Sequence, residues 1–194
     1  MWIILLCSVV ALGVFLERLL FLHRISIRVG ELLGGLSLLI RKGRIDEALA
    51  ESSASPGPAA RVLQAALLRP EASREVLQSV TADAALLEIP KLERNLPLLA
   101  SLAYLTPLLG LLGTVLGLLD AFLAISAHGG YATIAELSRG VYESLLNAAA
   151  GLGVAIPAYL GHSYLCSRVN DLIQDMERAG IEIVNLLTDR TDAA

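Results

Sequence analysis

The sequence predicts an all-α membrane protein with three transmembrane helices, the N-terminus outside and the C-terminus in the cytoplasm. Residues 96–127 contain no lysine, arginine or glutamate, and their one ionisable group is Asp120. A second apolar stretch, Leu145 to Cys166, begins just after Glu143. Since about 20 apolar residues cross a bilayer as a helix, both stretches are long enough. The chain is 55% hydrophobic with mean hydropathy +0.65, more than the surface of a soluble domain tolerates.

Charge and cysteine content exclude several classes of function. The net charge of −4 gives no reason to expect a nucleic-acid partner. Two cysteines, Cys7 and Cys166, cannot form a disulfide framework or a metal quartet. We therefore expect no metal and no cofactor, and we expect membrane lipids to surround the apolar stretches.

The first apolar run, residues 1–22, predicts the first transmembrane helix. No charge precedes it, and Arg18, Arg24 and Arg28 follow its apolar core, so it resembles an uncleaved helix more than a signal peptide. The positive-inside rule places its C-terminal end in the cytoplasm. We interpret the Glu17–Arg18 pair as an anchor at the membrane interface.

Residues 23–95 form the extended polar section, which we expect to be a cytoplasmic helical region continuous with the membrane helices. Basic residues and Gly43 end its first helix, and the ring of Pro90 is expected to end its last one. No strand-like alternation occurs. The predicted segments are helices at Val29–Ile40, Asp46–Ser52, Ala59–Leu68 and Glu71–Ile89, with a loop at Ser53–Pro58.

The remaining chain is divided by charge into two spans, a loop and a tail. The second transmembrane helix is predicted at 96–127. Residues 128–138 lack lysine and arginine, so they are predicted to form an external loop. The third transmembrane helix is predicted at 139–166, and a cytoplasmic C-terminal helix carrying Arg168, Arg178 and Arg190 at 167–194. Both spans exceed the hydrocarbon thickness, so we expect their helices to extend into the cytoplasmic bundle.

Small and hydroxyl residues recur at helical spacing in both spans. Steps of three and four place them on one face, where another backbone can approach closely. Gly113 and Gly117 form a GxxxG pair beside the first face, and Glu143 and Asn147 form a polar stripe beside the second. The two faces consist of Thr106, Gly110, Thr114, Gly117, Ala121 and Ala124, and of Ser144, Ala148, Gly151, Ala155 and Ala158.

Two interpretations of these residues stay open at this point. The small faces are compatible with helix packing alone, and Thr114 can bond its own helix backbone. Glu143 is compatible with a functional role or a structural one, because an intramembrane carboxylate must be protonated, paired or hydrated, and Arg139 lies one turn earlier.

Three segments resemble the TolQ/ExbB/MotA proton-channel family and are most similar to its ExbB/TolQ branch. They are residues 103–122, centred on the glycine- and threonine-rich run 106–117, then residues 143–157, and finally residues 16–19 at the end of the first span. The order and length of the segments agree, so the resemblance covers nearly the whole chain. MotA-like stators have four spans and are less similar.

The resemblance implies a pentameric ring in the bacterial inner membrane, whose second and third spans line an apolar pore. The pore would hold single-span partners of the ExbD/TolR type, whose intramembrane aspartate carries the proton, and a TonB/TolA-like energy transducer would receive the work. Thr114 matches the pore threonine and Glu143 the carboxylate of the third span. The implied proton pathway consists of Thr114, Glu143, Asn147 and Thr106, and the implied packing and pore-lining residues are Gly110, Gly113, Gly117, Ala148, Gly151 and Ala155.

One position departs from the family pattern. Ala148 stands where the family has a second threonine, so the ring offers fewer hydroxyls to a proton. Either Thr114 with Asn147 and water suffices, or conduction is weaker or works differently.

The favoured function is a subunit of a motor channel driven by the proton-motive force. The alternative is a structural membrane scaffold that conducts no ions and uses the same stripes only for packing. An intramembrane enzyme is not predicted, because the sequence contains no Ser/His/Asp set, paired intramembrane aspartates or HExxH arrangement.

Overall fold

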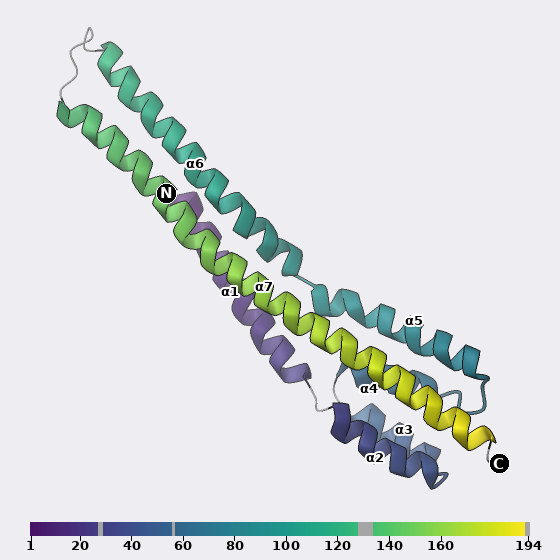
Figure 1. Ribbon diagram of the computed structural model, residues 1–194. Helices are drawn as coiled ribbons and strands as arrows, with labels where there is room; N and C mark the ends of the chain where they lie inside the picture. Colours follow the sequence, from purple (N-terminus) through teal and green to yellow (C-terminus); the bar gives the residue numbers. More distant parts are fainter. Residues whose placement is uncertain (27–28, 56, 128–133, 193–194) are drawn as a thin grey trace. The chain divides into compact units, whose positions relative to one another are not determined.

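A computed structural model describes residues 1–26, 29–55, 57–127 and 134–192 of the chain, and every regular element in these ranges is an α-helix. The helices are α1 Trp2–Ile25, α2 Val29–Arg41, α3 Ile45–Ala54, α4 Pro58–Leu67, α5 Arg74–Glu93, α6 Leu96–Ala127 and α7 Ile134–Asp192 (Figure 1). Three helical stretches are long and apolar enough to cross a membrane: Trp2–Ile25, Arg74–Leu123 and Ser138–Arg190. The prediction of an all-α membrane protein is thereby confirmed.

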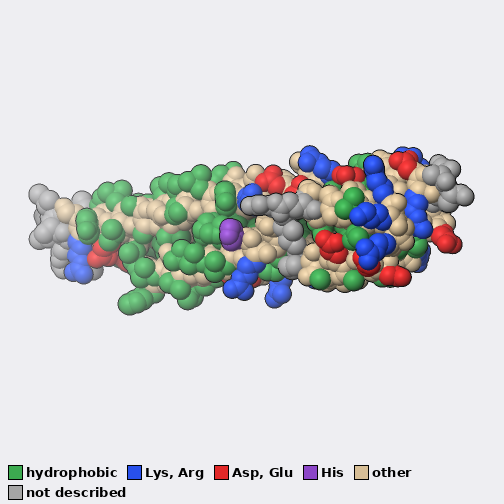
Figure 2. Space-filling view, turned by 90° about the horizontal axis from the view of Figure 1, so that it is seen from below, with side chains coloured by type: hydrophobic (Ala, Val, Ile, Leu, Met, Phe, Trp, Pro, Cys, Tyr) green, Lys and Arg blue, Asp and Glu red, His purple; other side chains and the backbone are tan. Residues whose placement is uncertain are grey.

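The chain divides into two compact units. Unit 1 comprises Met1–Arg18 and Asn95–Leu165, and unit 2 comprises Leu19–Arg94 and Cys166–Ala194. On the face seen in Figure 2, hydrophobic side chains cover most of unit 1, whereas Lys, Arg, Asp and Glu gather over unit 2. The apolar segments found in the sequence therefore coincide with the part of the surface that is suited to lipid.

In unit 2, α2 to α5 pack on one another, and α4 and α5 lie against the C-terminal part of α7. Its core consists of large apolar side chains, and Leu36, Ile40, Leu63, Met176 and Ile183 are at most 2% exposed. Gly57 precedes α4 with a φ of 145°, a conformation that glycine tolerates and most residues do not. The short helices of this bundle follow the predicted ones closely.

Two predicted boundaries in unit 2 are wrong. Helix α3 runs through Ala54 and α4 begins at Pro58, so the predicted loop 53–58 is shorter. Ser53 lies in α3 and Ser55 directly follows it, and their hydroxyls donate to the Leu49 and Glu51 carbonyls of α3 at 2.7 and 3.1 Å. Of the loop that remains, residue 56 lies outside the described residues.

Helix α5 also differs from its prediction, since it begins at Arg74 and does not end before Pro90. A turn closed by the Ala72 amide and the Arg69 carbonyl, 3.1 Å apart, occupies the residues before it. Pro90 lies inside the helix, which continues to Glu93. A proline removes one backbone hydrogen bond, but Leu92, 2% exposed, packs the following turn into the core. Tertiary packing therefore outweighs the local preference for a helix end.

Helix α6 occupies the residues of the second predicted span, and Asn95 separates it from α5. Asn95 adopts a positive φ of 64°, a conformation in which asparagine is enriched, and its carbonyl accepts the Leu99 amide at 3.2 Å. Helix α7 begins at Ile134, so the last part of the predicted loop 128–138 is helical. Residues 128–133 of that loop lie outside the described residues.

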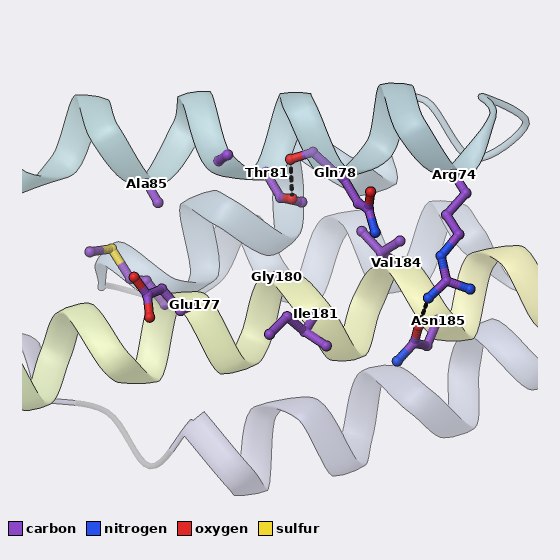
Figure 3. A pocket seen from close by; sticks show the side chains of 11 residues that line it. Arg74, Gln78, Thr81, Ala85, Glu177, Gly180, Ile181, Val184 and Asn185 are labelled. Carbon is purple, nitrogen blue, oxygen red and sulfur yellow. Dashed lines mark hydrogen bonds between the residues drawn. The ribbon is translucent and has the colours of Figure 1, made fainter.

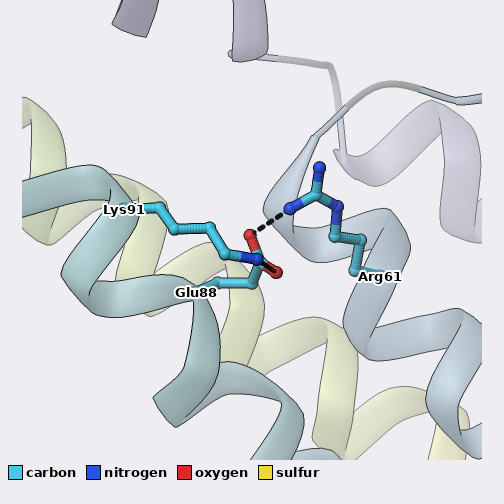
Figure 4. A network of polar contacts seen from close by, with 3 residues as sticks. All are labelled: Arg61, Glu88 and Lys91. Carbon is cyan, nitrogen blue, oxygen red and sulfur yellow. Dashed lines mark hydrogen bonds and ion pairs between the residues drawn. The ribbon is translucent and has the colours of Figure 1, made fainter.

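An ion-pair cluster ties α4 to α5. The carboxylate of Glu88 accepts hydrogen bonds from Arg61 at 2.7 Å and Lys91 at 2.6 Å (Figure 4). Its side chain is 9% exposed, while those of Arg61 and Lys91 are 58% and 55% exposed. Burial by itself would raise the pKa of Glu88, but the hydrogen bonds and charges of the two cations outweigh it and lower the pKa below 4.5.

Replacing Glu88 with Gln should lower the free energy of unfolding by about 1 kcal/mol at neutral pH, because two charge-assisted hydrogen bonds are lost while both cations stay hydrated. The folded-state pKa is depressed, so this stabilisation is full above the unfolded-state pKa, near 4.5, and is lost as the pH falls through the lower folded-state value. Thermal unfolding measured at pH 7 and at pH 3 should show a smaller difference between the proteins at pH 3 than at pH 7. Glu182→Gln, at an exposed position of α7, is the control and should match the wild type at both pH values.

Candidate functional site

The candidate site in unit 1 is built on the contact between α6 and α7, which run side by side in Figure 1. Gly110 and Gly151 meet at its centre. A Cβ atom on Gly151 would lie 2.9 Å from the Thr106 carbonyl oxygen and 3.0 Å from Gly110 Cα. Because neither glycine has a side chain, the two backbones touch, as small residues permit in membrane helices.

Further along the two helices, Ser144 provides a polar link across the same contact. Its hydroxyl lies 2.7 Å from the Gly140 carbonyl oxygen and 3.2 Å from the Thr114 carbonyl oxygen, so it can donate within α7 or across to α6. A Cβ on Gly117 would lie 2.5 Å from the Ser144 hydroxyl. Glycine at position 117 therefore gives Ser144 the room to reach the backbone of α6.

Several members of the predicted small-residue faces lie in the α6–α7 contact, namely Gly110, Gly117 and Ala121 of α6 and Ser144, Ala148 and Gly151 of α7. Thr106 is fully buried, and Ala121, Ala155 and Ala158 are between 5% and 9% exposed. A Cβ on Gly140 would lie 2.7 Å from Ala121 Cβ, which extends the contact toward the end of α6. The side chain of Ala124, the last member of the predicted α6 face, lies outside the described residues.

The two threonines of α6 both donate to their own helix, as their sequence context allowed. Thr106 donates to the Leu102 carbonyl at 2.5 Å and Thr114 to the Leu111 carbonyl at 2.6 Å. Thr106 is fully buried, whereas Thr114 is partly exposed. Each hydroxyl oxygen keeps lone pairs, but only that of Thr114 is accessible at the surface of the chain.

Asn147 packs against Gly113 and leaves one polar atom without a partner. A Cβ on Gly113 would lie 2.9 Å from Asn147 Cβ, so the absent side chain provides the space that the amide occupies. The Asn147 Oδ1 atom is buried and has no hydrogen-bond partner among the described residues. An acceptor left in this state costs about 1–3 kcal/mol, which favours a bound water or a donor from another chain.

Thr114 and Asn147 lie on opposite edges of the α6–α7 contact. At ~100° per residue, Gly110 and Gly117 point between Thr114 and Gly113 on α6. On α7 the contact residues Ser144 and Gly151 likewise point between Asn147 and Ala148. Asn147 therefore shares an edge with Gly113, and Ala148 shares the other edge with Thr114.

Glu143 pairs with Arg139, the partner that the sequence offered. Arg139 Nε and Glu143 Oε1 are 3.1 Å apart, one turn apart on α7, and the two side chains are 81% and 56% exposed within the single chain. Asp120 of α6 is also exposed. No group of three or more His, Cys, Asp or Glu side chains in the described ranges is arranged to hold a metal ion.

Two features of unit 1 were not foreseen. Asn95 donates to Glu17 at 3.2 Å, which links α1 to the residue before α6. Glu17 also lies 3.0 Å from Arg18, the pair that the sequence offered, and Arg18 is 2% exposed. Tyr104 and Tyr159 meet edge to face, with ring centroids 6.4 Å apart. The sequence signals were the charged pair and the tyrosines within apolar stretches, but the partners are too far apart in the chain to be matched.

Comparison with known proteins adds an independent finding. The profile of the MotA/TolQ/ExbB proton channel family matches residues 54–178, a range that includes the whole α6–α7 contact. An ExbB homolog of the biopolymer transport proteins from Methanothermobacter thermautotrophicus is 28% identical over 175 residues, which cover 87% of this chain and 62% of that protein.

Shorter matches point in the same direction. TolQ of the Tol-Pal system from Haemophilus influenzae is 42% identical over 88 residues, covering 45% of this chain and 38% of TolQ. An ExbB-like biopolymer transport protein from Synechocystis is 30% identical over 154 residues, covering 79% of this chain and 73% of that protein. The chain thus spans less than two thirds of the first two relatives.

Replacing Gly151 with Ala should destabilise the protein by about 1–3 kcal/mol, because the new Cβ must push the α6 backbone away. Gly153→Ala is the matched control on the same helix, since a Cβ there meets nothing within 4 Å. Thermal unfolding of both variants in detergent should show a lower midpoint for Gly151→Ala and an unchanged or higher one for Gly153→Ala. Equal midpoints would contradict a backbone contact at Gly151.

Proposed function

Because this chain belongs to the MotA/TolQ/ExbB proton channel family and to its ExbB/TolQ branch, we propose that it is a subunit of a motor channel driven by the proton-motive force in the bacterial inner membrane. The observation that carries this proposal is the position of Thr114. Its hydroxyl oxygen lies at one edge of the glycine-rich contact between α6 and α7.

The proposed topology has three spans, with the N-terminus outside and the C-terminus in the cytoplasm. The spans are residues 1–22, 96–127 and 139–166, and the cytoplasmic parts are 23–95 and 167–194. Arg24, Lys91 and Arg168 lie at the proposed inner ends of the three spans, in agreement with the positive-inside rule. Unit 2, with its charged surface, is the cytoplasmic bundle in this arrangement.

We propose further that the chain forms a ring, a pentamer by similarity to the family, around a narrow apolar corridor. The edge of the α6–α7 contact that carries Thr114 and Ala148 faces this corridor. Gly110, Gly117 and Gly151 lie in the contact between α6 and α7 of each chain. They therefore set the distance between the two helices and add no polar side chains to the corridor. The corridor would hold the single-span partner of the ExbD/TolR type with its intramembrane aspartate.

In this proposal the polar residues of unit 1 have separate roles. Thr114 accepts a hydrogen bond from the partner's protonated aspartate or from a hydrated proton in the corridor. Asn147 binds a water through its unpartnered Oδ1, and Glu143, paired with Arg139, supplies a charge on the same side as Asn147. Thr106 contributes only after its hydroxyl leaves the Leu102 carbonyl.

The work done by the ring would be passed to an envelope process through a transducer of the TonB/TolA type. This step rests on the named functions of the relatives, which are biopolymer transport and the Tol-Pal system. The chain itself performs no covalent chemistry in the proposal, and it is not an enzyme.

A second candidate function is a structural scaffold that conducts no ions. One observation favours it: the small residues of α6 and α7 are already used in packing within the chain. The two functions differ only in the polar residues, which a scaffold does not need.

Replacing Thr114 with Val should reduce proton flux through the assembled complex in liposomes to background, because the isosteric methyl group cannot accept a hydrogen bond. Thr114→Ser should retain most of the flux. Thr188→Val is the matched control, since Thr188 donates to its own helix in the same way, at 2.8 Å from the Val184 carbonyl, but lies in unit 2. Full flux in Thr114→Val with an intact ring would favour the scaffold.

Replacing Ala148 with Thr should raise proton flux above that of the wild type, because it adds a hydroxyl on the edge that carries Thr114. The matched variant Ala149→Thr places the hydroxyl on an exposed position one residue away and should leave the flux unchanged. Flux that is equal in wild type and Ala148→Thr would show that a second hydroxyl is not limiting.

A further inference from the structure

A groove in unit 2 separates α5 from the C-terminal part of α7. It has a volume of about 340 Å³ and is lined by both apolar and polar side chains, and Arg74 and Asn185 are joined at one end by a hydrogen bond of 3.0 Å (Figure 3). Gly180 forms its floor, where a Cβ would lie 3.4 Å from Thr81. Ile181 also lines it and is 65% exposed.

The outer side of α7 carries a second, shallower depression that also includes Ile181. Its central line consists of Gln174, Arg178, Ile181 and Asn185, which follow the helical steps of four, three and four. We call these four residues the α7 stripe. All of them are at least partly exposed, and Arg178 has no ion-pair partner among the described residues.

Helix α5 carries a matching line on the side opposite the groove. Val76, Val80, Asp83 and Leu87 follow the same steps, and we call them the α5 stripe. Val76 is 41% and Leu87 71% exposed. Asp83 is exposed and, like Arg178, has no ion-pair partner in the described part of the chain.

The α5 stripe and the α7 stripe lie at the same level along the helix axes of unit 2. Helices α5 and α7 are antiparallel within unit 2, since Arg74 bonds Asn185 and Thr81 lies against Gly180. One residue forward on α5 therefore matches one residue backward on α7. By this register, which Thr81 and Gly180 fix, Val80 is level with Ile181 and Asp83 is level with Arg178.

We propose that the α5 stripe of one copy of this chain docks on the α7 stripe of the next copy. The inference rests on the ring in the proposed function and specifies which surfaces close it. A ring needs two different, complementary surfaces on each copy, which is the heterologous type of interface. Rotation about an axis parallel to the helices preserves height, so residues at the same level on the two stripes meet.

Two of the four facing pairs are complementary in chemistry, and the other two place Val76 beside Asn185 and Leu87 beside Gln174. Val80 meets Ile181, which covers the exposed isoleucine, and Asp83 meets Arg178, which gives each charge its partner. The acidic neighbours on α7, Glu177 and Glu182, lie level with the small residues Ala84 and Ser79 of α5, so no like charges face each other. A pair of this kind adds specificity of register more than affinity.

The test is disulfide cross-linking of the full-length chain in membranes, in a background with Cys7 and Cys166 replaced by Ala. The variant Val80→Cys/Ile181→Cys should give a ladder of covalent oligomers up to the ring size on a non-reducing gel, because each copy offers one cysteine to either neighbour. Each single-cysteine variant should stay monomeric. Leu38→Cys/Ile181→Cys is the matched control, since Leu38 is exposed to 56% on another helix of unit 2.

A charge exchange checks the register. Asp83→Arg and Arg178→Asp should each lower the fraction of assembled rings several-fold in detergent, and the double variant Asp83→Arg/Arg178→Asp should restore it. The interface would be overturned if Val80→Cys/Ile181→Cys gave no more cross-linking than Leu38→Cys/Ile181→Cys, or if a single-cysteine variant gave dimers. It would also be overturned if the double charge variant failed to restore assembly. A ladder of oligomers from a complex that conducts no protons would support the interface but contradict the proposed function. Proton conduction without such a ladder would support the function but contradict the interface.

Discussion

The backbone contact of Gly110 with Gly151 is the constraint on which unit 1 depends. It brings α6 and α7 close enough for Ser144 to reach the Thr114 carbonyl and for Asn147 to fill the space beside Gly113. Lipid tails are as apolar as leucine, so burial of large side chains gives little drive for helices to associate in a bilayer. Close packing of small residues replaces it, and the position of every polar group in the site follows from this distance.

Unit 2 is stabilised by different physics. Its core is filled by large side chains such as Leu36, Leu63 and Ile183, as expected for helices held together by burial of apolar area. Glu88 adds an ion pair whose two cations, Arg61 and Lys91, stay exposed, which keeps the desolvation cost of the pair modest. The division into two units thus coincides with a change in the force that holds helices together, and α7 contributes to both.

The sequence was sufficient for the helices and for the faces that carry small residues, because spacing and hydropathy are local properties. It was insufficient at Pro90, where burial of Leu92 outside the local window keeps the helix going. It could not separate Thr114 from Asn147 either, since the edge on which a residue lies depends on where the second helix packs. The register of α5 against α7 is another long-range property, because it is defined by contacts in the structure such as the hydrogen bond between Arg74 and Asn185.

The bond from Thr114 to the Leu111 carbonyl has a consequence for what the proposed corridor could hold. A hydroxyl has one proton, and here that proton is already given to the backbone at 2.6 Å. While that bond is kept, the Thr114 oxygen can accept a hydrogen bond from a protonated carboxyl group, but it cannot donate one to a carboxylate. A partner helix in such a corridor would donate a hydrogen bond to Thr114 while its carboxyl group is protonated. It would lose that bond when the carboxyl group ionises, so the protonation state would decide when the helix leaves Thr114.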